Sequence, residues 1–166
     1  MSQKYQDYEE KSYELDLKDK KILRLLNKDA RMSLTAISKK TGIPIDTIRY
    51  RINEMKKKDI FSYAVIINPL KMGYPIFNIL YLQLVGFSKE KEKELVGYVN
   101  QHPYLAYAAK TTGKYDFAIG IIAKNMKQFD VIANEVKTKF QDIIKDVDTL
   151  LIIEEYKYDY LVDLIA

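Results

Sequence analysis

The chain has 166 residues, a formal net charge of +4, 48% hydrophobic residues and 30% charged residues. This composition is typical of a globular protein, and the length allows one domain or two small ones. Because the chain contains no cysteine, disulfides and thiolate metal sites are excluded, and we expect a cytoplasmic protein. No apolar run approaches the roughly 18 residues that a membrane span needs, so no membrane partner is expected.

The positive charge is concentrated in one part of the chain. Residues 1–17 have a net charge of −3, and residues 59–166 have a net charge of −2. Between them, residues 18–58 hold thirteen lysines or arginines against four acidic residues, which gives a net charge of +9. A basic block of this size is typical of a domain that binds a polyanion, and it favours double-stranded DNA as a partner.

Residues 1–14 have no apolar periodicity and are expected to form a flexible N-terminal arm. A first helix is predicted after Asp16 or Asp19, either of which can act as its N-cap, and Ser33 is a suitable N-cap for a second helix. The inward positions of these two helices are Ile22, Leu23, Leu25, Leu26, Leu34 and Ile37.

The third predicted helix, residues 45–58, follows a short break at Thr41-Gly42, and Pro44 suits its first turn. Its inward stripe recurs at helical spacing and consists of Ile45, Ile48, Ile52 and Met55. Helix, tight glycine turn and helix form a helix-turn-helix motif, whose second helix fits the major groove of DNA. An ordinary amphipathic helix with a solvated basic face is the alternative.

The outward side of residues 45–58 carries side chains that can contact DNA. Arginine, asparagine and threonine pair with base edges, and arginine and lysine also pair with phosphates. The residues expected near base edges are Asp46, Thr47, Tyr50 and Asn53. The residues expected on phosphates are Lys39, Lys40, Arg49, Arg51, Lys56 and Lys57. A solvated surface charge is the alternative for each lysine.

Residues 60–67 are predicted to form a strand, either as a wing of the helix-turn-helix or as a bridge to the next unit. Asn68-Pro69 ends this strand, and residues 69–75 are interpreted as a linker. The predicted organisation is therefore an arm at 1–14, a DNA-binding domain at 15–68 and a second domain at 76–166.

In the second half, strands and helices alternate. Strands are predicted at 77–85, 104–111, 115–123 and 147–156, and helices at 89–100 and 126–140. The order βαββαβ is the ferredoxin-like arrangement, in which both helices cover one face of a four-stranded sheet. The predicted fold class is α+β, with a helix-turn-helix domain, winged or simple, followed by a ferredoxin-like domain.

The first and last strands of this sheet are apolar on both sides. Phe77, Ile79 and Tyr81 alternate with leucines, and Leu150 and Ile152 alternate with further apolar residues. A sheet with helices on one side should bury its other face, and a second copy of the chain is the simplest partner. A homodimer would set two recognition helices about one turn of DNA, roughly 34 Å, or a multiple of it apart.

Several of these segments together resemble the Lrp/AsnC, or feast/famine, family of transcription regulators, from Leu15 to about Tyr156. In the first half the matching pieces are Leu15-Asp16-x-x-Asp19-x-x-Ile22-Leu23, Asp29-Ala30-Arg31-x-Ser33, Gly42-Ile43 and Thr47-Ile48-x-x-Arg51-Ile52. In the second half the piece is Thr112-Gly113-x-Tyr115-Asp116. The chain departs from the pattern where the family usually has a serine, a glycine and an alanine, at Pro44, Asp59 and Ser38.

The resemblance implies a transcription regulator whose dimers often form octamers and which commonly responds to amino acids. It also places the loop at 111–116 at a subunit interface where small ligands bind. Gly113 can adopt a positive φ and expose backbone N–H groups, and Asp116 could meet an ammonium group. The expected effector-binding residues are Thr111, Thr112, Gly113, Lys114, Tyr115 and Asp116. A plain hairpin turn is the alternative.

We do not expect an enzyme. The chain has no glycine-rich phosphate loop, nucleophile elbow or HExxH pattern, and we predict no catalytic residue, metal site or cofactor. The single histidine, His102, is interpreted as a helix end. Some Lrp-like proteins decarboxylate tetrapyrroles, but the net charge of −2 in residues 59–166 argues against a polycarboxylate substrate. A sensor partner that does not itself bind DNA is the other alternative.

Overall fold

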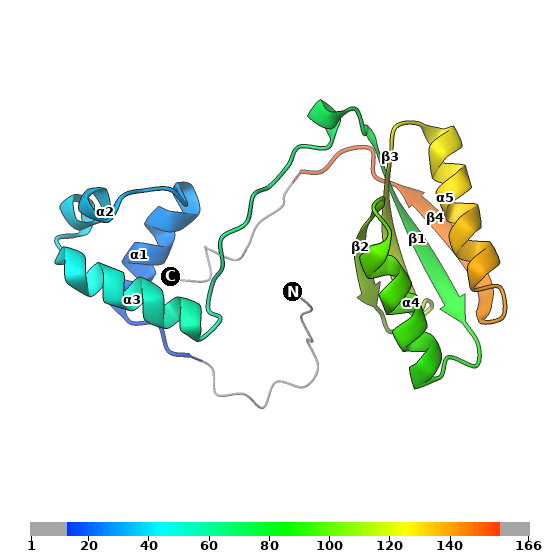
Figure 1. The fold of residues 1–166 in the computed structure, drawn as a ribbon, viewed down its shortest axis with the longest axis horizontal. Helices are drawn as coiled ribbons and strands as arrows, with labels where there is room; N and C mark the ends of the chain where they lie inside the picture. The colour runs from blue at the N-terminus through cyan, green and yellow to red at the C-terminus, as the bar shows by residue number, and fades with distance from the viewer. Residues whose placement is uncertain (1–12, 157–166) are drawn as a thin grey trace. The chain divides into compact units, whose positions relative to one another are not determined.

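The computed structural model describes residues 13–156, which divide into two compact units, residues 13–65 and 66–156 (Figure 1). The predicted arm at 1–14 lies almost wholly outside the described residues. The domain limits predicted at 15, 68 and 76 stay predictions. No helix between residues 13 and 156 is long and apolar enough to span a membrane.

The first unit contains three helices, α1 (Leu17–Lys28), α2 (Leu34–Thr41) and α3 (Ile45–Lys57), as the sequence predicts. Their apolar stripes meet in one core, and burying each large aliphatic side chain there contributes about 1.5–3 kcal/mol. The buried members are Ile22, Leu23, Leu26, Ile37, Ile43, Ile48, Ile52 and Met55. Leu25 and Leu34 pack against the edge of this core. The inward prediction for Ile45 is wrong, because this residue opens the first turn of α3 and is 36% exposed.

The first two helices start at the caps that the sequence provides. The Asp16 carboxylate accepts hydrogen bonds from the backbone N–H groups of Lys18 and Asp19. The Asp19 side chain accepts one in return from the backbone N–H of Asp16, which completes a capping box. Ser33 caps α2 by accepting from the N–H of Ala36. The predicted caps at Asp16 and Ser33 are thus confirmed.

Helix α3 ends in a left-handed turn at a residue other than glycine. Asp59 has φ = 53°. The N–H of Ile60 donates to the carbonyl of Met55 at 2.9 Å, and the N–H of Asp59 donates to that of Lys56 at 3.1 Å. These two bonds form a Schellman motif, in which glycine usually occupies the left-handed position. Asp59 therefore keeps the cap geometry at a cost in backbone strain.

The strand predicted at 60–67 is wrong. Ile60 and Phe61 pack on the edge of the helical core, but the structure has no strand between residues 60 and 67. Val65, Ile66 and Ile67 are 90%, 74% and 67% exposed. None of the described strand ladders includes a residue of this segment, and a strand without partners is not stable.

The second unit has the predicted βαββαβ order and ferredoxin-like fold. Its antiparallel sheet has the strand order β2-β3-β1-β4. After a short 3-10 helix at Leu70–Met72, the elements are β1 (Ile76–Leu84), α4 (Lys89–Gln101), β2 (Leu105–Lys110), β3 (Phe117–Ala123), α5 (Met126–Lys139) and β4 (Ile144–Leu151). The sequence predicts the last strand at 147–156, but β4 spans residues 144–151. Exposed acids such as Asp146 interrupt the apolar alternation of this edge strand, so the pattern does not indicate where it begins.

The two faces of the sheet differ in their cover. On one face, Leu80, Leu82, Ile119 and Ile121 are fully buried in one core with residues of α4 and α5 (Figure 1). The opposite face, called the bare face below, is not covered by any described element of the second unit. Its residues include Phe77, Ile79, Tyr81, Tyr107, Gly120 and Leu150, and Asp148 lies opposite Tyr81 on the same face.

Gly120 leaves room for an aromatic ring on the bare face. Gly120 stands opposite Ile79 in the ladder between β1 and β3. A Cβ at this position would come within 2.7 Å of the Phe77 ring and 2.8 Å of the Tyr107 Cβ. A larger residue would therefore push the Phe77 ring off the sheet. Phe77, Ile79, Tyr107 and Leu150 give this part of the bare face an aromatic and aliphatic surface.

Candidate nucleic-acid interface

Helix α3 presents an exposed polar stripe to solvent. Asp46, Arg49, Tyr50 and Asn53, called the outward stripe below, recur at the i, i+3, i+4 and i+7 spacing of one helix face. All four are exposed, and Tyr50 is 66% exposed. Thr47, also predicted near base edges, is half-buried at the rim of this stripe.

Arg49 belongs to an ion pair within the outward stripe. Its Nη1 lies 2.6 Å from Oδ1 of Asp46, one turn earlier on α3. The side chains of Arg49 and Asp46 are 57% and 92% exposed. Both groups therefore remain open to a partner that approaches the N-terminal half of α3.

Arg51 points away from the outward stripe and ties α3 to α1. Its Nη1 donates to Asp16 at 2.7 Å and to Asp19 at 2.8 Å. The Asp19 side chain is only 3% exposed, so Arg51 supplies the cation that a buried carboxylate needs. Hydrogen bonding to Asp19 raises the pKa of Arg51, and the backbone N–H of Asp19 together with Arg51 lowers the pKa of Asp16.

The lysines predicted on phosphates lie at the ends of α2 and α3. Lys39 and Lys40 are exposed in the last turn of α2. Lys56 and Lys57 are exposed in the last turn of α3, where Lys57 lies 3.1 Å from Glu54 and Lys56 lies over the Tyr63 ring. The same unit thus brings together the outward stripe and four exposed lysines.

The predicted effector loop, residues 111–116, joins β2 to β3. Gly113 has φ = 116°, in the left-handed region that favours glycine, and residues 112–114 are exposed. The Asp116 carboxylate accepts a hydrogen bond from the backbone N–H of Leu84 at 2.7 Å. The Asp116 carboxylate, which was expected to meet the ammonium group of an effector, is therefore hydrogen-bonded to the last residue of β1.

A different carboxylate stands beside this loop with an ammonium next to it. Asp148 of β4 lies opposite Tyr81 in the ladder between β1 and β4. It accepts from the Tyr115 hydroxyl and lies 3.2 Å from Nζ of Lys114, which also sits 4.8 Å from the centre of the Tyr115 ring. Sequence reasoning missed Asp148 and Tyr81 because only the strand register places them beside the loop.

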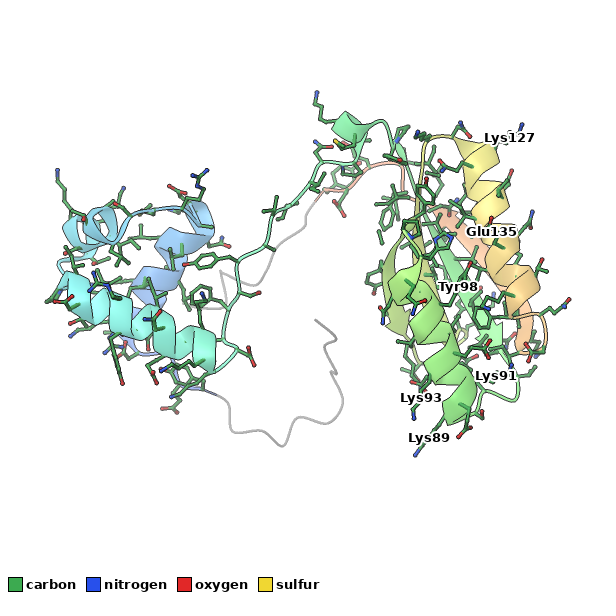
Figure 2. All side chains as sticks on the ribbon, viewed as in Figure 1. Lys89, Lys91, Lys93, Tyr98, Lys127 and Glu135 are labelled. Carbon is green, nitrogen blue, oxygen red and sulfur yellow. The ribbon has the colours of Figure 1, made fainter. Side chains whose placement is uncertain are left out.

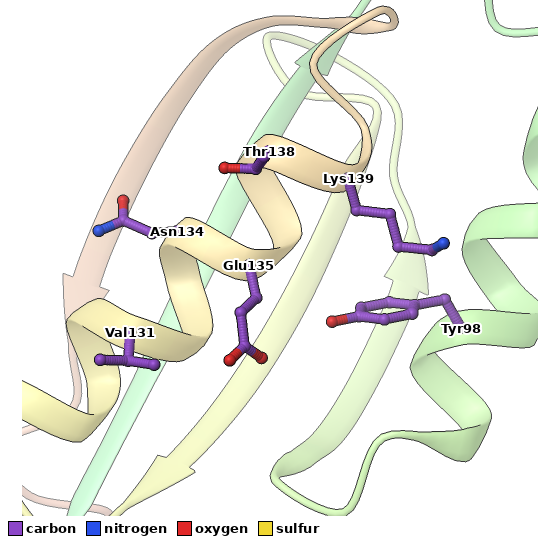
Figure 3. A pocket seen from close by; sticks show the side chains of 6 residues that line it. All are labelled: Tyr98, Val131, Asn134, Glu135, Thr138 and Lys139. Atoms are coloured by element: carbon purple, nitrogen blue, oxygen red, sulfur yellow. The ribbon is translucent and has the colours of Figure 1, made fainter.

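The helix layer of the second unit carries a shallow hollow that the sequence did not predict (Figure 3). It lies between α4 and α5 and is lined by Tyr98, Val131, Asn134, Glu135, Thr138 and Lys139. Lys139 lies over the Tyr98 ring, and Glu135 lies 3.4 Å from His102, the C-cap of α4 as predicted. Among the lysines of α4 labelled in Figure 2, Lys89 and Lys93 are exposed, whereas Lys91 is half-buried and lies 2.7 Å from Asp142.

Comparison with protein families and curated proteins also identifies the first unit as a helix-turn-helix DNA-binding domain. A model of winged helix-turn-helix DNA-binding domains matches residues 15–61, which include α1, α2 and α3. The chain is 31% identical over 148 residues to an uncharacterised HTH-type transcriptional regulator of Pyrococcus horikoshii, covering 89% of this chain and 91% of the relative. It is 30% identical over 126 residues to the HTH-type transcriptional regulator LrpA of that organism, covering 74% and 86%.

Solved structures share the fold over most of the chain. An AsnC family transcriptional regulator from Agrobacterium tumefaciens has a TM-score of 0.80 at 21% identity, covering 88% of this chain and 95% of its own. AsnC of E. coli has a TM-score of 0.79 at 23% identity, with 90% and 99% covered. A transcriptional regulator of Neisseria meningitidis in complex with L-Met has a TM-score of 0.80 at 17% identity, with 91% and 99% covered.

The helix-turn-helix of the first unit and the ferredoxin-like second unit are joined in one chain, as in these structures. The curated relatives are named transcriptional regulators, and the match to them extends through both units. The chain therefore belongs to the Lrp/AsnC family of transcription regulators.

Proposed function

We propose that this chain is a sequence-specific DNA-binding regulator whose homo-oligomer responds to a small effector. The observation that carries the DNA part is the outward stripe of α3, exposed on a helix whose other side is buried in the core. Arg51 fixes this helix to α1, and the surrounding residues 18–58 have a net charge of +9. A helix held in this way presents fixed base contacts to a major groove.

The proposed contacts differ in kind along the unit. Asp46, Thr47, Tyr50 and Asn53 face base edges, because they occupy or border the outward stripe. Lys39, Lys40, Lys56 and Lys57 neutralise phosphates from the ends of α2 and α3. We assign Arg51 no DNA contact, because its guanidinium is engaged by Asp16 and Asp19.

Binding of the full-length protein to its own promoter fragment over a salt series tests this proposal. We expect the logarithm of the association constant to fall with that of the salt concentration by about 0.9 per neutralised phosphate. The protein should keep its preference for the promoter fragment over a scrambled duplex at every salt concentration. Absence of binding at low salt would contradict the proposal.

Two charge variants assign the phosphate contacts. Lys39→Gln should weaken binding to both duplexes and reduce the salt slope by about 1, because one phosphate contact is lost. Lys127→Gln is the matched control, since Lys127 is an exposed lysine at the start of α5 in the second unit. The control variant should leave both the affinity and the slope as in the unmodified protein.

The proposed homo-oligomer buries the bare face of the sheet against a second copy. Tyr107 and Leu150 are 50% and 56% exposed there, beside half-buried Phe77, Ile79 and Tyr81. An exposed apolar face of this kind is typical of an interface between copies. A dimer would supply two copies of α3 for two half-sites, and further assembly would give the octamer expected from the family resemblance.

The proposed effector is an amino acid that binds at residues 111–116. Support comes from the exposed loop with its left-handed Gly113 and from the L-Met complex of the Neisseria meningitidis regulator. Isothermal titration of the full-length protein with the twenty common amino acids tests this. We expect binding by at least one of them and loss of that binding in Gly113→Val, which strains the loop. No heat of binding with any of the twenty would contradict the effector proposal.

A further inference from the structure

The two arginines of α3 have different environments. The chain has four arginines, Arg24, Arg31, Arg49 and Arg51, all within its basic block. On α3, Arg51 is bound by carboxylates of α1, whereas Arg49 lies in the outward stripe with a side chain that is 57% exposed. Arg49 is therefore the guanidinium that α3 can offer to a base.

The partner of Arg49 is unusual for a surface that binds DNA. Asp46 is 92% exposed in the first turn of α3, the part of a recognition helix that meets base edges. A lone carboxylate there would repel phosphates. Paired with Arg49 at 2.6 Å, it forms a unit with no net charge. Such a unit adds little to phosphate binding, because that binding depends on uncompensated positive charge.

The same pair has the donors and acceptors of a base reader. One Arg49 nitrogen is held by Oδ1 of Asp46, and a guanidinium has five N–H donors in a planar fork. A fork oriented by a carboxylate matches the O6 and N7 acceptors of guanine. The Asp46 carboxylate can also accept a hydrogen bond from the N4 amino group of cytosine.

We propose that Asp46 and Arg49 together read a guanine in the major groove of each half-site, with Arg49 as the base contact and Asp46 as its positioning residue. The proposal rests on the proposed DNA binding and changes one assignment made from the sequence. Arg49 contacts a base edge rather than a phosphate. Each half-site bound by this protein then contains a guanine whose N7 and O6 are required.

Selection from random duplex DNA with the full-length protein tests the proposal. The enriched sequence is synthesised with 7-deazaguanine, which lacks the N7 acceptor, at one guanine at a time. We expect one guanine in each half-site at which this replacement weakens binding by about fivefold or more, as loss of one arm of a bidentate contact predicts. Replacement of the other guanines should have no comparable effect.

A charge-balanced double variant shows which residues read that guanine. Asp46→Asn with Arg49→Gln removes the pair and leaves the net charge unchanged. We expect this variant to bind the enriched duplex about tenfold more weakly, to lose its sensitivity to 7-deazaguanine and to keep the salt slope. Lys40→Gln is the control, and it should lower the slope while keeping the sensitivity to 7-deazaguanine.

The outcomes separate the two proposals. If the unmodified protein enriches no sequence, the proposed sequence-specific DNA binding fails and this inference fails with it. If a sequence is enriched but the double variant keeps its sensitivity to 7-deazaguanine, the guanine-reading role of the pair is overturned and the DNA-binding proposal stands. Full binding by Arg49→Lys would also overturn it, because lysine lacks the planar fork.

Discussion

The guanidinium of Arg51 bridges a capping carboxylate, Asp16, and a buried one, Asp19, so a single side chain couples the start of α1 to the middle of α3. Arg51→Ala should lower the free energy of unfolding by about 1–3 kcal/mol, because Asp19 loses its charged partner. DNA affinity should fall as α3 loosens, but the salt slope should not change. Chemical denaturation and a salt series measure the two effects. A slope reduced by about 1 would instead show that Arg51 contacts a phosphate.

The same group of residues predicts how stability depends on pH. The pKa of Asp16 lies below its ordinary value, because the ionised carboxylate is hydrogen-bonded by the backbone N–H of Asp19 and by Arg51. Its stabilising contribution is therefore complete above the unfolded pKa of about 4 and is lost as the pH falls through the folded pKa. Asp16→Asn keeps a good N-cap without a charge. Denaturation of the unmodified protein and of Asp16→Asn should show a difference in the free energy of unfolding at pH 7 that shrinks below pH 4. A difference that stayed constant with pH would contradict this role of Asp16.

At the scale of elements, the end of α3 shows a local conflict between residue and conformation. Asp59 adopts φ = 53° in a Schellman motif that favours glycine. Asp59→Gly should raise the free energy of unfolding by about 0.5–1 kcal/mol, because relief of the left-handed strain exceeds the added entropy of the unfolded chain. Asp59→Val should lower it, since a β-branched residue is most strained there. Thermal denaturation of the two variants would contradict the argument if their order were reversed.

The elements that the sequence predicts well are those set by local chemistry. The caps at Asp16 and Ser33 and the period of the apolar stripes specify the helices before any tertiary contact is known. Residues 60–67 have the composition of a strand, but a strand also needs a partner, which composition cannot reveal. The contacts of Arg51 and Asp148 could not be predicted for a related reason, because their partners lie more than thirty positions away in the chain.

At the scale of the whole molecule, the bare face should decide whether the chain is a monomer or a dimer. Leu150 is 56% exposed, so Leu150→Lys should change the stability of one copy by less than about 0.5 kcal/mol. In a dimer, the same substitution buries two charges at the interface and should disrupt it. Val131→Lys is the matched control, because Val131 is 52% exposed on α5, which covers the opposite face. Light scattering should show smaller particles for Leu150→Lys only.

Loss of the dimer should weaken DNA binding because the two copies of α3 are no longer linked. The residues proposed to contact DNA are unchanged. The Leu150→Lys variant keeps every residue of the outward stripe, so its preference among single half-site duplexes should equal that of the unmodified protein. On a duplex with two half-sites it should lose the gain that two linked copies of α3 provide, which reaches about a hundredfold for well-matched spacing. Titration of both duplexes with Leu150→Lys and Val131→Lys measures this gain directly. If the two variants bound the double site equally well, the two copies of α3 would have to be joined by some surface other than the bare face.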